Sequence, residues 1–461
     1  MGKTILEFPS NFLFGTATSS FQVEGDSGER KTDWDEYLKK YPTIVDPAEK
    51  GPQWWEKGKA EQDIKMISEL GMKVQRISFE WGRIEPEKGI INHTAVKRYK
   101  EIVKSIKENG MIPIITLNHY TLPSWVAKKG SWKNRETVGF FKHYVKFVVS
   151  NFPEVTYWLT LNEPNVLLIM GYLSHYFPPQ DNNIFSTFTV WSNLVNAHKT
   201  AYRSIKKINP TARVGASVFF RWNKPVNNHD FVERIYAYIV NNISQINYVR
   251  EIKNTSDFIA CNYYTGYFLK LNFRKLRLSA GSERQRIHKT ILFGELRKPY
   301  AYESDYGWPI VPDFFLDLLK NLRQKFHKPI IITENGIADK RDKNRSLYTL
   351  THLVAIWRAL KDGVNIEQYI HWSTIDNLEW MEGYRKSFGL IALNAITGER
   401  TIRKSAYLYK DIATSGRIDV EYLLNKYFSG EQKERADEMI RDLIAGRENQ
   451  TVGVTGRIIS P

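Results

Sequence analysis

The chain has 461 residues, of which 42% are hydrophobic, 25% are charged and 13% are aromatic. This composition is typical of a globular protein with a large core. The formal net charge of +16 is its unusual feature. Such a charge either keeps a protein in solution or attracts an anionic partner, such as nucleic acid, an acidic polymer or anionic lipid. No zinc-finger, RNA-recognition or helix-turn-helix signature accompanies it, so we expect no nucleic-acid partner.

The sequence also argues against export and against a membrane span. Its start, MGKTILEFPSNFLFG, has no basic stretch followed by a long apolar run, so no signal peptide is expected. No window approaches the ~18 uninterrupted apolar residues of a spanning helix. Cys261 is the only cysteine, which excludes an internal disulfide framework and suits a reducing cytoplasm. We therefore expect a cytoplasmic location and no membrane partner.

Short β-rich runs alternate with longer amphipathic stretches up to about residue 410. The runs are mostly continuous in apolar character, as expected of parallel strands that are buried on both faces. Eight strands are predicted, at Leu13–Ser20, Lys73–Phe79, Ile112–His119, Thr156–Asn162, Arg213–Phe220, Phe258–Tyr264, Pro329–Thr333 and Gln368–Thr374. Helical patterns lie between them, for example at Ala95–Asn109, Val138–Ser150, Asp313–Lys325 and Leu347–Asp362.

Eight successive βα units predict a single (β/α)8 barrel, and a large doubly wound sheet is the less favoured arrangement. Gly110 and Gly363 stand where two of the helices should end, because glycine is the usual residue just after a helix. No low-complexity linker divides the chain. We assign residues 1–414 to the barrel and residues 415–461 to a helical tail.

Within the tail, helices are predicted at Val420–Tyr427 and Glu431–Ala445. Apolar residues recur along one side of the second helix, which predicts that this side packs on the barrel. A dimer contact is the alternative. The residues of this stripe are Ala436, Met439, Ile440, Leu443 and Ile444.

The segment after the sixth strand, residues 266–305, is irregular and rich in lysine and arginine. In a barrel this connection leaves the carboxyl ends of the strands. We interpret it as a solvated flap. The alternative is a surface that draws in anionic ligands or docks the protein on an acidic surface.

Two glutamates stand where apolar strands end, which is where barrels of this kind place their active sites. The fourth strand ends in TLNEP (160–164), with Glu163, and the seventh ends in ITENG (332–336), with Glu334. One such glutamate is weak evidence, because surface charges and helix caps also fall there. Two, each beside an asparagine, form the pair that glycoside hydrolysis requires. One is a protonated acid for the leaving oxygen, and the other is an ionised partner for the oxocarbenium-like carbon.

Other strand ends carry polar and aromatic groups of the kind that a sugar ring needs. Singly, each has a structural explanation, such as a core histidine or a buried ion pair, but their convergence on one face favours a binding site. These residues are Gln22, Arg76, His119, Asn262, Tyr263, Tyr264, Trp372, Glu379 and Trp380.

With these motifs the chain resembles the family 1 glycoside hydrolases, the β-glucosidase/β-galactosidase family, over about residues 6–414. The motifs TLNEP and ITENG correspond to the family's acid/base and nucleophile segments. The other matching segments are FLFGTATSSFQVEG (12–25), RISFEWGRIEP (76–86), TLNHYTLPSW (116–125), DFIACNYYT (257–265) and HWSTIDNLEWMEGY (371–384).

The resemblance implies a retaining exo-β-glycosidase that acts on small β-glycosides or oligosaccharides by double displacement. Glu163 would be the acid/base and Glu334 the nucleophile, with Arg76, Tyr264 and Asn262 beside them. β-D-Glucosides, galactosides and fucosides are the implied substrates, and neither a metal nor an organic cofactor is implied. The implied substrate-binding residues are Gln22, His119, Asn162, Trp308, Trp372, Glu379, Trp380 and Phe388. The preferred sugar and the oligomeric state stay open.

Three alternatives accompany this interpretation. The first is 6-phospho-β-glycosidase activity, but such relatives tend to carry a serine where Trp380 stands, and Glu379 would repel a phosphate. The second is a non-catalytic glycan-binding relative, a class that usually lacks one of the two glutamates. The third, a nucleic-acid binder, rests on the charge alone.

Overall fold

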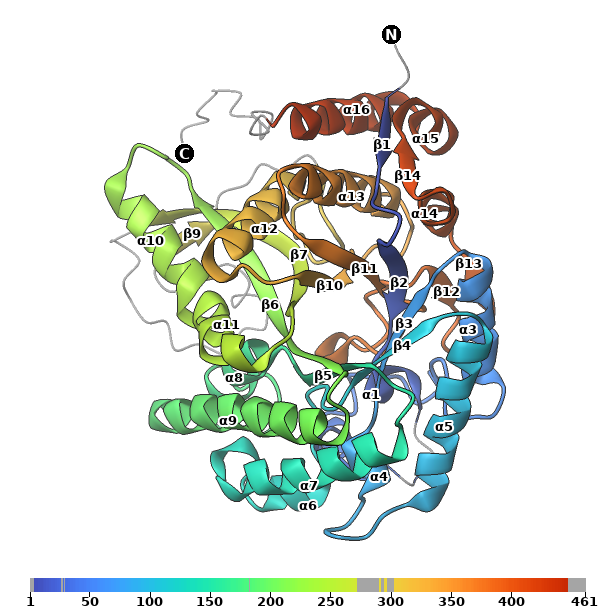
Figure 1. The fold of residues 1–461 in the computed structure, drawn as a ribbon, viewed down its shortest axis with the longest axis vertical. Helices are drawn as coiled ribbons and strands as arrows, with labels where there is room; N and C mark the ends of the chain where they lie inside the picture. Colours follow the sequence, from blue (N-terminus) through green and yellow to red (C-terminus); the bar gives the residue numbers. More distant parts are fainter. Residues whose placement is uncertain are drawn as a thin grey trace.

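Eight parallel strands form a closed barrel with the long helices outside it (Figure 1). The barrel closes where β11 pairs with β2, Trp372 opposite Ala17, and where β10 pairs with β7, Glu334 opposite Asn262. The predictions of a (β/α)8 barrel and of eight strands in these places are therefore confirmed. The strands are β2 (Leu13–Ala17), β3 (Val74–Ser78), β4 (Ile112–Thr116), β5 (Tyr157–Asn162), β6 (Arg213–Pro225), β7 (Ile259–Leu271), β10 (Ile330–Asn335) and β11 (Ile366–Trp372).

This computed structural model describes residues 4–446 except 26, 27, 29, 182, 272–289, 292, 293 and 297–301. The basic segment after the sixth strand falls largely on these exceptions, so both interpretations of it lie outside the described residues. In the described part of the chain, no helix combines the length and the apolar character needed to cross a bilayer.

The strands are continuous in apolar character because both of their faces are covered. Every residue of β3 and β10 is buried. Strands β6 and β7 extend past their predicted ends, because their parallel pairing continues from Trp222 opposite Gly266 to Pro225 opposite Leu269. Beyond the barrel, β9 (Gly294–Leu296) pairs antiparallel with β7 and with β8 (Thr290–Ile291).

Long helices follow the strands, and four of them match the predicted helical patterns. Burial of one apolar face against the barrel accounts for their positions. The long helices are α3 (Lys59–Glu69), α5 (His93–Glu108), α7 (Glu136–Asn151), α9 (Ile184–Ile208), α10 (Phe231–Asn241), α12 (Pro312–Phe326), α13 (Arg345–Lys361) and α14 (Lys404–Ser415). Shorter helices are α1 (Ser20–Val23), α2 (Asp33–Lys40), α4 (Trp81–Ile84), α6 (Ser124–Lys128), α8 (Pro164–Tyr172) and α11 (Asn247–Ile252).

The tail lies on the outer side of α13 and α14 (Figure 1). Strand β14 (Arg417–Asp419) pairs antiparallel with β1 (Ile5–Glu7), and α15 (Val420–Tyr427) and α16 (Gly430–Ala445) follow it. Helix α16 contacts α13, and its residues Ala436, Met439, Ile440 and Leu443 are buried. A hairpin of β12 (Ile391–Leu393) and β13 (Arg400–Ile402) lies between β11 and α14.

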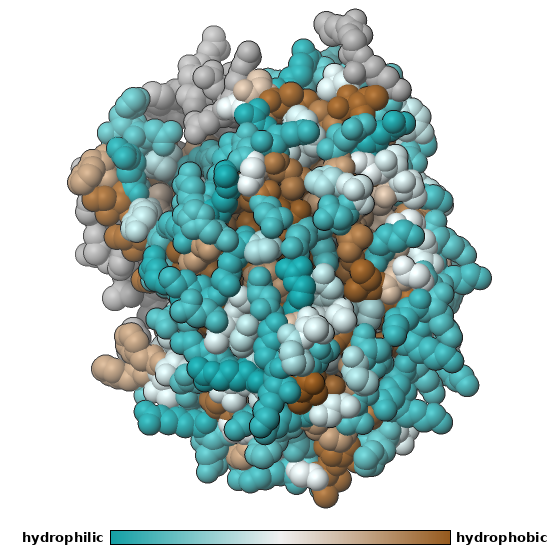
Figure 2. All heavy atoms as spheres, viewed as in Figure 1, coloured by the Kyte–Doolittle hydropathy of each residue, from teal (hydrophilic) through white to brown (hydrophobic). Residues whose placement is uncertain are grey.

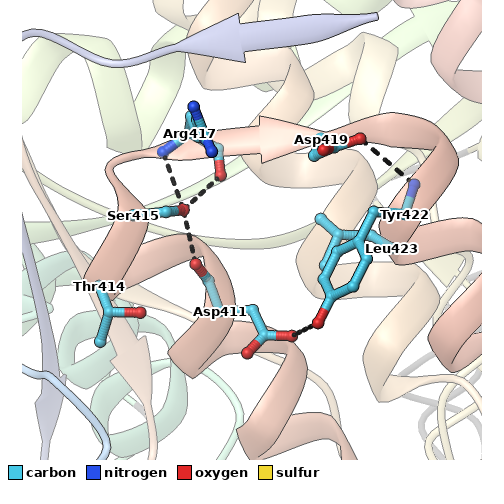
Figure 3. Close-up of a pocket in the computed structure, with 7 residues that line it drawn as sticks. All are labelled: Asp411, Thr414, Ser415, Arg417, Asp419, Tyr422 and Leu423. Atoms are coloured by element: carbon cyan, nitrogen blue, oxygen red, sulfur yellow. Dashed lines mark hydrogen bonds between the residues drawn. The ribbon is translucent and has the colours of Figure 1, made fainter. Parts of the chain in front are cut away.

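A small hollow separates α14 from the first residues of the tail (Figure 3). The Tyr422 and Tyr427 hydroxyls and the Lys426 ammonium donate to the Asp411 carboxylate beside it. The hollow lies next to the β1–β14 pair, and β1 precedes the amino end of β2. It therefore belongs to the end of the barrel opposite the strand ends that carry the two glutamates.

Candidate active site

Glu334 lies near the carboxyl end of β10 and is buried. The guanidinium of Arg76 on β3 donates from Nη1 to Glu334 Oε1 at 2.5 Å and to the Thr333 carbonyl at 3.0 Å. The Tyr264 hydroxyl on β7 donates to Glu334 Oε2 at 2.6 Å. Burial raises the pKa of Glu334, while the Arg76 charge and the Tyr264 hydroxyl act against that rise. Both oxygens are therefore held by donors that favour the carboxylate form.

Glu163 follows β5 directly and stands at the start of α8. Its backbone is left-handed, with φ 44° and ψ 55°, a strained conformation for a residue with a side chain. Two contacts hold it there: its N–H donates to the Ser217 carbonyl at 2.8 Å, and its own carbonyl accepts from Val166 at 2.9 Å. Pro164, the first residue of α8, fixes the exit of the chain. The strand-to-helix turn thereby aims the Glu163 side chain toward the neighbouring strands.

The Glu163 carboxyl group contacts neutral donors. The Asn262 amide donates to Oε1 at 2.7 Å, and the Tyr120 hydroxyl donates to Oε2. Burial, followed by the charge of Glu334, raises the pKa of Glu163 to about 8, while the Tyr120 and Asn262 donors act in the opposite direction. Like charges at close range cannot both ionise freely. Glu163 is therefore the member of the pair that keeps its proton at neutral pH.

Asn162 connects the two carboxyl groups to His119. Its Oδ1 accepts from Arg76 Nη2 at 2.7 Å and from Asn262 Nδ2 at 3.2 Å. This fixes the amide orientation, so Nδ2 faces His119 Nε2 at 3.1 Å and donates to it. Burial and the Arg76 charge hold the pKa of His119 well below its usual range, so the imidazole is neutral. Thr333 donates to Asn262 Oδ1 at 2.6 Å and fixes that amide as well.

Two tryptophans pack against His119, and Glu379 directly precedes one of them, Trp380. The rings of Trp372 and Trp380 stack on the imidazole, with centroids 5.8 and 6.2 Å away. Burial, and then the charges of Glu334 and Glu163, raise the pKa of Glu379 to about 8. This electrostatic coupling places Glu379 near both carboxyl groups. The Glu379 carboxyl group accepts a hydrogen bond from the Tyr306 hydroxyl at 3.5 Å.

The remaining predicted residues lie beside the loop that leads to Glu379 and around Tyr264. Gln22 on α1 donates to the Leu378 carbonyl at 2.6 Å and to Asn377 at 3.0 Å, so it holds the loop that leads to Glu379. Trp308 and Phe388 flank Tyr264, with ring centroids 6.1 and 5.8 Å away. The structure thus brings the predicted site residues to the carboxyl end of the barrel in one connected set of contacts, with the exception of Tyr263. The Tyr263 ring stacks on Phe315 of α12 and its hydroxyl donates to the Val311 carbonyl at 3.2 Å, so this side chain points away from the site, as alternate residues of a strand do.

Sequence reasoning missed Tyr120, Tyr306 and Thr333. Tyr120 directly follows His119 at the end of a strand, and this position in the sequence could have identified it as a site residue. Thr333 directly precedes Glu334, but nothing in the sequence showed that it would orient Asn262. Tyr306 lies in an irregular stretch, where no periodic pattern points to a site. Among the described residues, no group of three or more His, Cys, Asp or Glu is arranged to hold a metal ion.

Comparisons with known proteins agree with this geometry. The model of glycosyl hydrolase family 1 matches residues 5–244 and 239–417. Beta-glucosidase A of Acetivibrio thermocellus is 30% identical over 451 residues, which cover 88% of this chain and 98% of that protein. A 6-phospho-beta-galactosidase 1 of Streptococcus pneumoniae is 28% identical over 463 residues, with 88% and 97% covered.

Among solved structures, a beta-glycosidase from Pyrococcus horikoshii superposes with a TM-score of 0.80 at 31% identity. The match covers 93% of this chain and all of that one. The family match and the paired carboxyl groups at the ends of β5 and β10 lead to one conclusion: the chain belongs to glycosyl hydrolase family 1 and is a glycoside hydrolase.

Proposed function

We propose that the protein is a retaining exo-β-glycosidase that hydrolyses β-D-glucosides and related galactosides and fucosides. The observation that carries the proposal is the unequal environment of two neighbouring buried carboxyl groups. Glu334 is paired with the Arg76 cation, whereas Glu163 is held by neutral donors and charged only at higher pH. Two carboxyl groups with separated protonation states are what a double displacement requires.

In the first step, a Glu334 oxygen attacks the anomeric carbon as the bond from that carbon to the leaving oxygen breaks. Glu163 gives its proton to that oxygen, and a covalent glycosyl-enzyme forms. Arg76 and Tyr264 hold the attacking carboxylate in its charged form and fix its direction. Their donors belong to separate strands of the barrel, so the nucleophile is positioned by rigid elements.

In the second step, Glu163 acts as a base. Once Glu334 is bound to the sugar its charge is gone, so the electrostatic cause of the raised pKa of Glu163 is removed. Glu163 takes a proton from water, the water oxygen attacks the anomeric carbon, and the bond to Glu334 breaks. The product keeps the β configuration because the carbon is inverted twice.

Sugar binding falls to the groups around His119. The neutral imidazole keeps one nitrogen, Nδ1, without a hydrogen-bond partner among the described residues, which fits a group that binds a substrate hydroxyl. Trp372 and Trp380 offer flat apolar faces, and Glu379 offers a carboxyl group for the hydroxyls at one end of the ring. A cytoplasmic location accompanies the proposal and rests on the single, buried cysteine, Cys261.

A panel of 4-nitrophenyl β-glycosides tests the substrate class. Turnover of the β-glucoside, galactoside or fucoside, with the β-anomer appearing first by NMR, supports the proposal. Initial release of the α-anomer would exclude a retaining mechanism.

A second candidate is hydrolysis of 6-phospho-β-glycosides, and it is favoured by the similarity to the 6-phospho-beta-galactosidase of S. pneumoniae. Against it stands the buried Glu379, whose carboxyl group would repel a phosphate dianion once it ionises, above its pKa of about 8. A higher kcat/KM for the 6-phosphoglucoside than for the glucoside would favour this candidate over the first.

A further inference from the structure

Helix α10 and the π-helical turn that follows it, Asn242–Ile246, expose an apolar face. Its residues recur at the spacing of one helical face, and we call this set the α10 ridge. The ridge consists of Phe231, Val232, Ile235, Tyr238, Ile239 and Ile243, with exposed fractions of 69%, 46%, 42%, 61%, 49% and 55%. The opposite face, with Tyr236, Ala237 and Val240, is buried in a cluster with Tyr267 and Leu269 of β7. The helix is thus apolar on the side that it packs and also on the side that it exposes.

A helix that only covers a barrel needs polar residues on its outer side. The ridge instead lies at the outer edge of the molecule, where Figure 2 shows brown residues over α10. An exposed apolar patch of several hundred Å², on the order of the largest found on ordinary monomers, usually marks an interaction site. Packing among the described residues therefore gives no reason for the ridge.

The charges beside the ridge are cationic. Arg234 lies on the exposed side of α10. The Lys325 ammonium lies 5.4 Å from the Tyr238 ring centroid and donates to Asn242 Oδ1 at 3.0 Å. Burial, followed by the charge of Arg250, lowers the pKa of Lys325.

The acidic groups of α10 face inward or cap the helix. Asp230 accepts from the backbone N–H groups of Val232 and Glu233. Glu233 is buried and accepts from Asn227. The face that carries the ridge therefore combines apolar side chains with positive charge, on a chain of formal net charge +16.

Charge decides which partner fits this face. A second copy of the chain would bring the same cations toward each other across a two-fold axis, and both copies carry a large positive charge. An anionic lipid surface would neutralise them while the apolar side chains enter the region between the headgroups and acyl chains. We propose that the α10 ridge docks the enzyme on anionic lipid, which departs from the expectation of no membrane partner and is independent of the proposed catalytic function.

The test is sedimentation of the full-length protein with vesicles of phosphatidylcholine alone and of phosphatidylcholine mixed with phosphatidylglycerol. The wild type should bind the mixed vesicles and bind the neutral ones more weakly. The variant Phe231→Ser/Ile235→Ser/Ile239→Ser should lower the partition coefficient on mixed vesicles about tenfold or more, because it removes inserted apolar area. Arg234→Glu should also weaken binding, and added salt should reduce that difference.

The matched control is Phe185→Ser/Phe188→Ser at the start of α9, where the exposed fractions are 78% and 75%. It removes two strongly exposed apolar side chains elsewhere on the surface and should leave vesicle binding unchanged. All variants should retain wild-type turnover of a small neutral aryl glycoside, which shows that they fold. The proposal is overturned if the wild type ignores the mixed vesicles, or if the ridge variant binds them as well as the wild type. It is also overturned if light scattering shows a wild-type dimer that the ridge variant abolishes, with no vesicle binding by either protein.

Discussion

Arg76 and Glu334 form a buried ion pair with 2.5 Å between Nη1 and Oε1. Among the described residues, Glu163 accepts hydrogen bonds from the Asn262 amide and the Tyr120 hydroxyl. Neither of these donors carries a charge. A cation on one carboxyl group and neutral donors on the other separate their titrations. The proposed division of labour, with Glu334 as nucleophile and Glu163 as acid/base, follows from that difference.

Glu334→Gln should lower kcat by roughly 10⁴-fold or more, because the amide keeps the shape of the side chain but cannot form the glycosyl-enzyme. Binding of a ground-state sugar should survive, and calorimetry with a non-hydrolysed ligand measures it. Azide should not restore a retained product. Near-wild-type turnover of this variant would remove Glu334 from the mechanism.

Glu163→Ala should affect substrates according to their leaving group. A poor alkyl leaving group needs the proton of Glu163, so its kcat/KM should fall much more than that of a dinitrophenyl glycoside. The comparison of two substrates on one variant controls for damage to folding. Equal losses for the two would assign Glu163 a role other than proton transfer.

The pH profile of kcat/KM should be bell-shaped. Activity falls at low pH as Glu334 becomes protonated, and it falls at high pH as Glu163 loses its proton, around pH 8. Tyr120→Phe removes a donor that stabilises the ionised form of Glu163, so the pKa of Glu163 should rise and the alkaline limb should move to higher pH.

A matched control for Tyr120→Phe is Tyr202→Phe, since the Tyr202 hydroxyl donates to the Asp257 carboxylate outside the site. Its profile should match the wild type. Glu379 also has a pKa raised to about 8, so Glu379→Gln decides which group sets the alkaline limb. If the alkaline fall of kcat/KM disappeared in Glu379→Gln, the titration of Glu379 would be its cause, and our account would be contradicted.

Glu379→Ala should cost about 1–3 kcal/mol of transition-state binding on a β-glucoside, the range for leaving a buried hydrogen-bonding group without its partner. The loss should be smaller on the xyloside, which lacks the hydroxymethyl group. The ratio of kcat/KM for the two sugars, in wild type and variant, measures the difference. An unchanged ratio would mean that Glu379 does not contact that end of the ring.

Ile440→Ala should lower the free energy of unfolding by about 2–4 kcal/mol. Ile440 lies on the buried side of α16, the helix that contacts α13, and truncating its side chain leaves a cavity. Denaturant unfolding measures this loss. Ile396→Ala, at a position that is 59% exposed, is the control and should change it little. A minor effect at Ile440 would show that the tail does not stabilise the barrel.

The barrel was predictable from sequence because its strands are short, apolar and regularly spaced. Continuous runs such as Ile330–Ile332 are buried on both faces, so the pattern reports burial directly. Glu163 and Glu334 were predictable because each interrupts such a run at the end where parallel strands converge. The extension of β6 and β7 beyond their predicted ends was not predictable. It depends on the pairing of these two strands with each other, which no local sequence pattern encodes.

The contacts among the side chains of the site were harder to predict from the sequence. Asn262 was expected near the carboxyl pair, but its part in joining Thr333 to Glu163 depends on the β7–β10 register. Tyr120 adopts a left-handed backbone, with φ 72°, that no propensity favours for tyrosine. The α10 ridge was missed because amphipathic spacing identifies a helix without showing that apolar residues occupy its outer side as well.

Trapping of the glycosyl-enzyme tests the central claim most directly. A 2-deoxy-2-fluoro-β-glucoside with a good leaving group slows the second step more than the first, so the covalent intermediate accumulates. Our account predicts one fluoroglucosyl group per chain, found by peptide mass spectrometry on the peptide that contains Glu334 and absent from Glu334→Gln. A label on any other peptide, or full turnover without a covalent adduct, would contradict it.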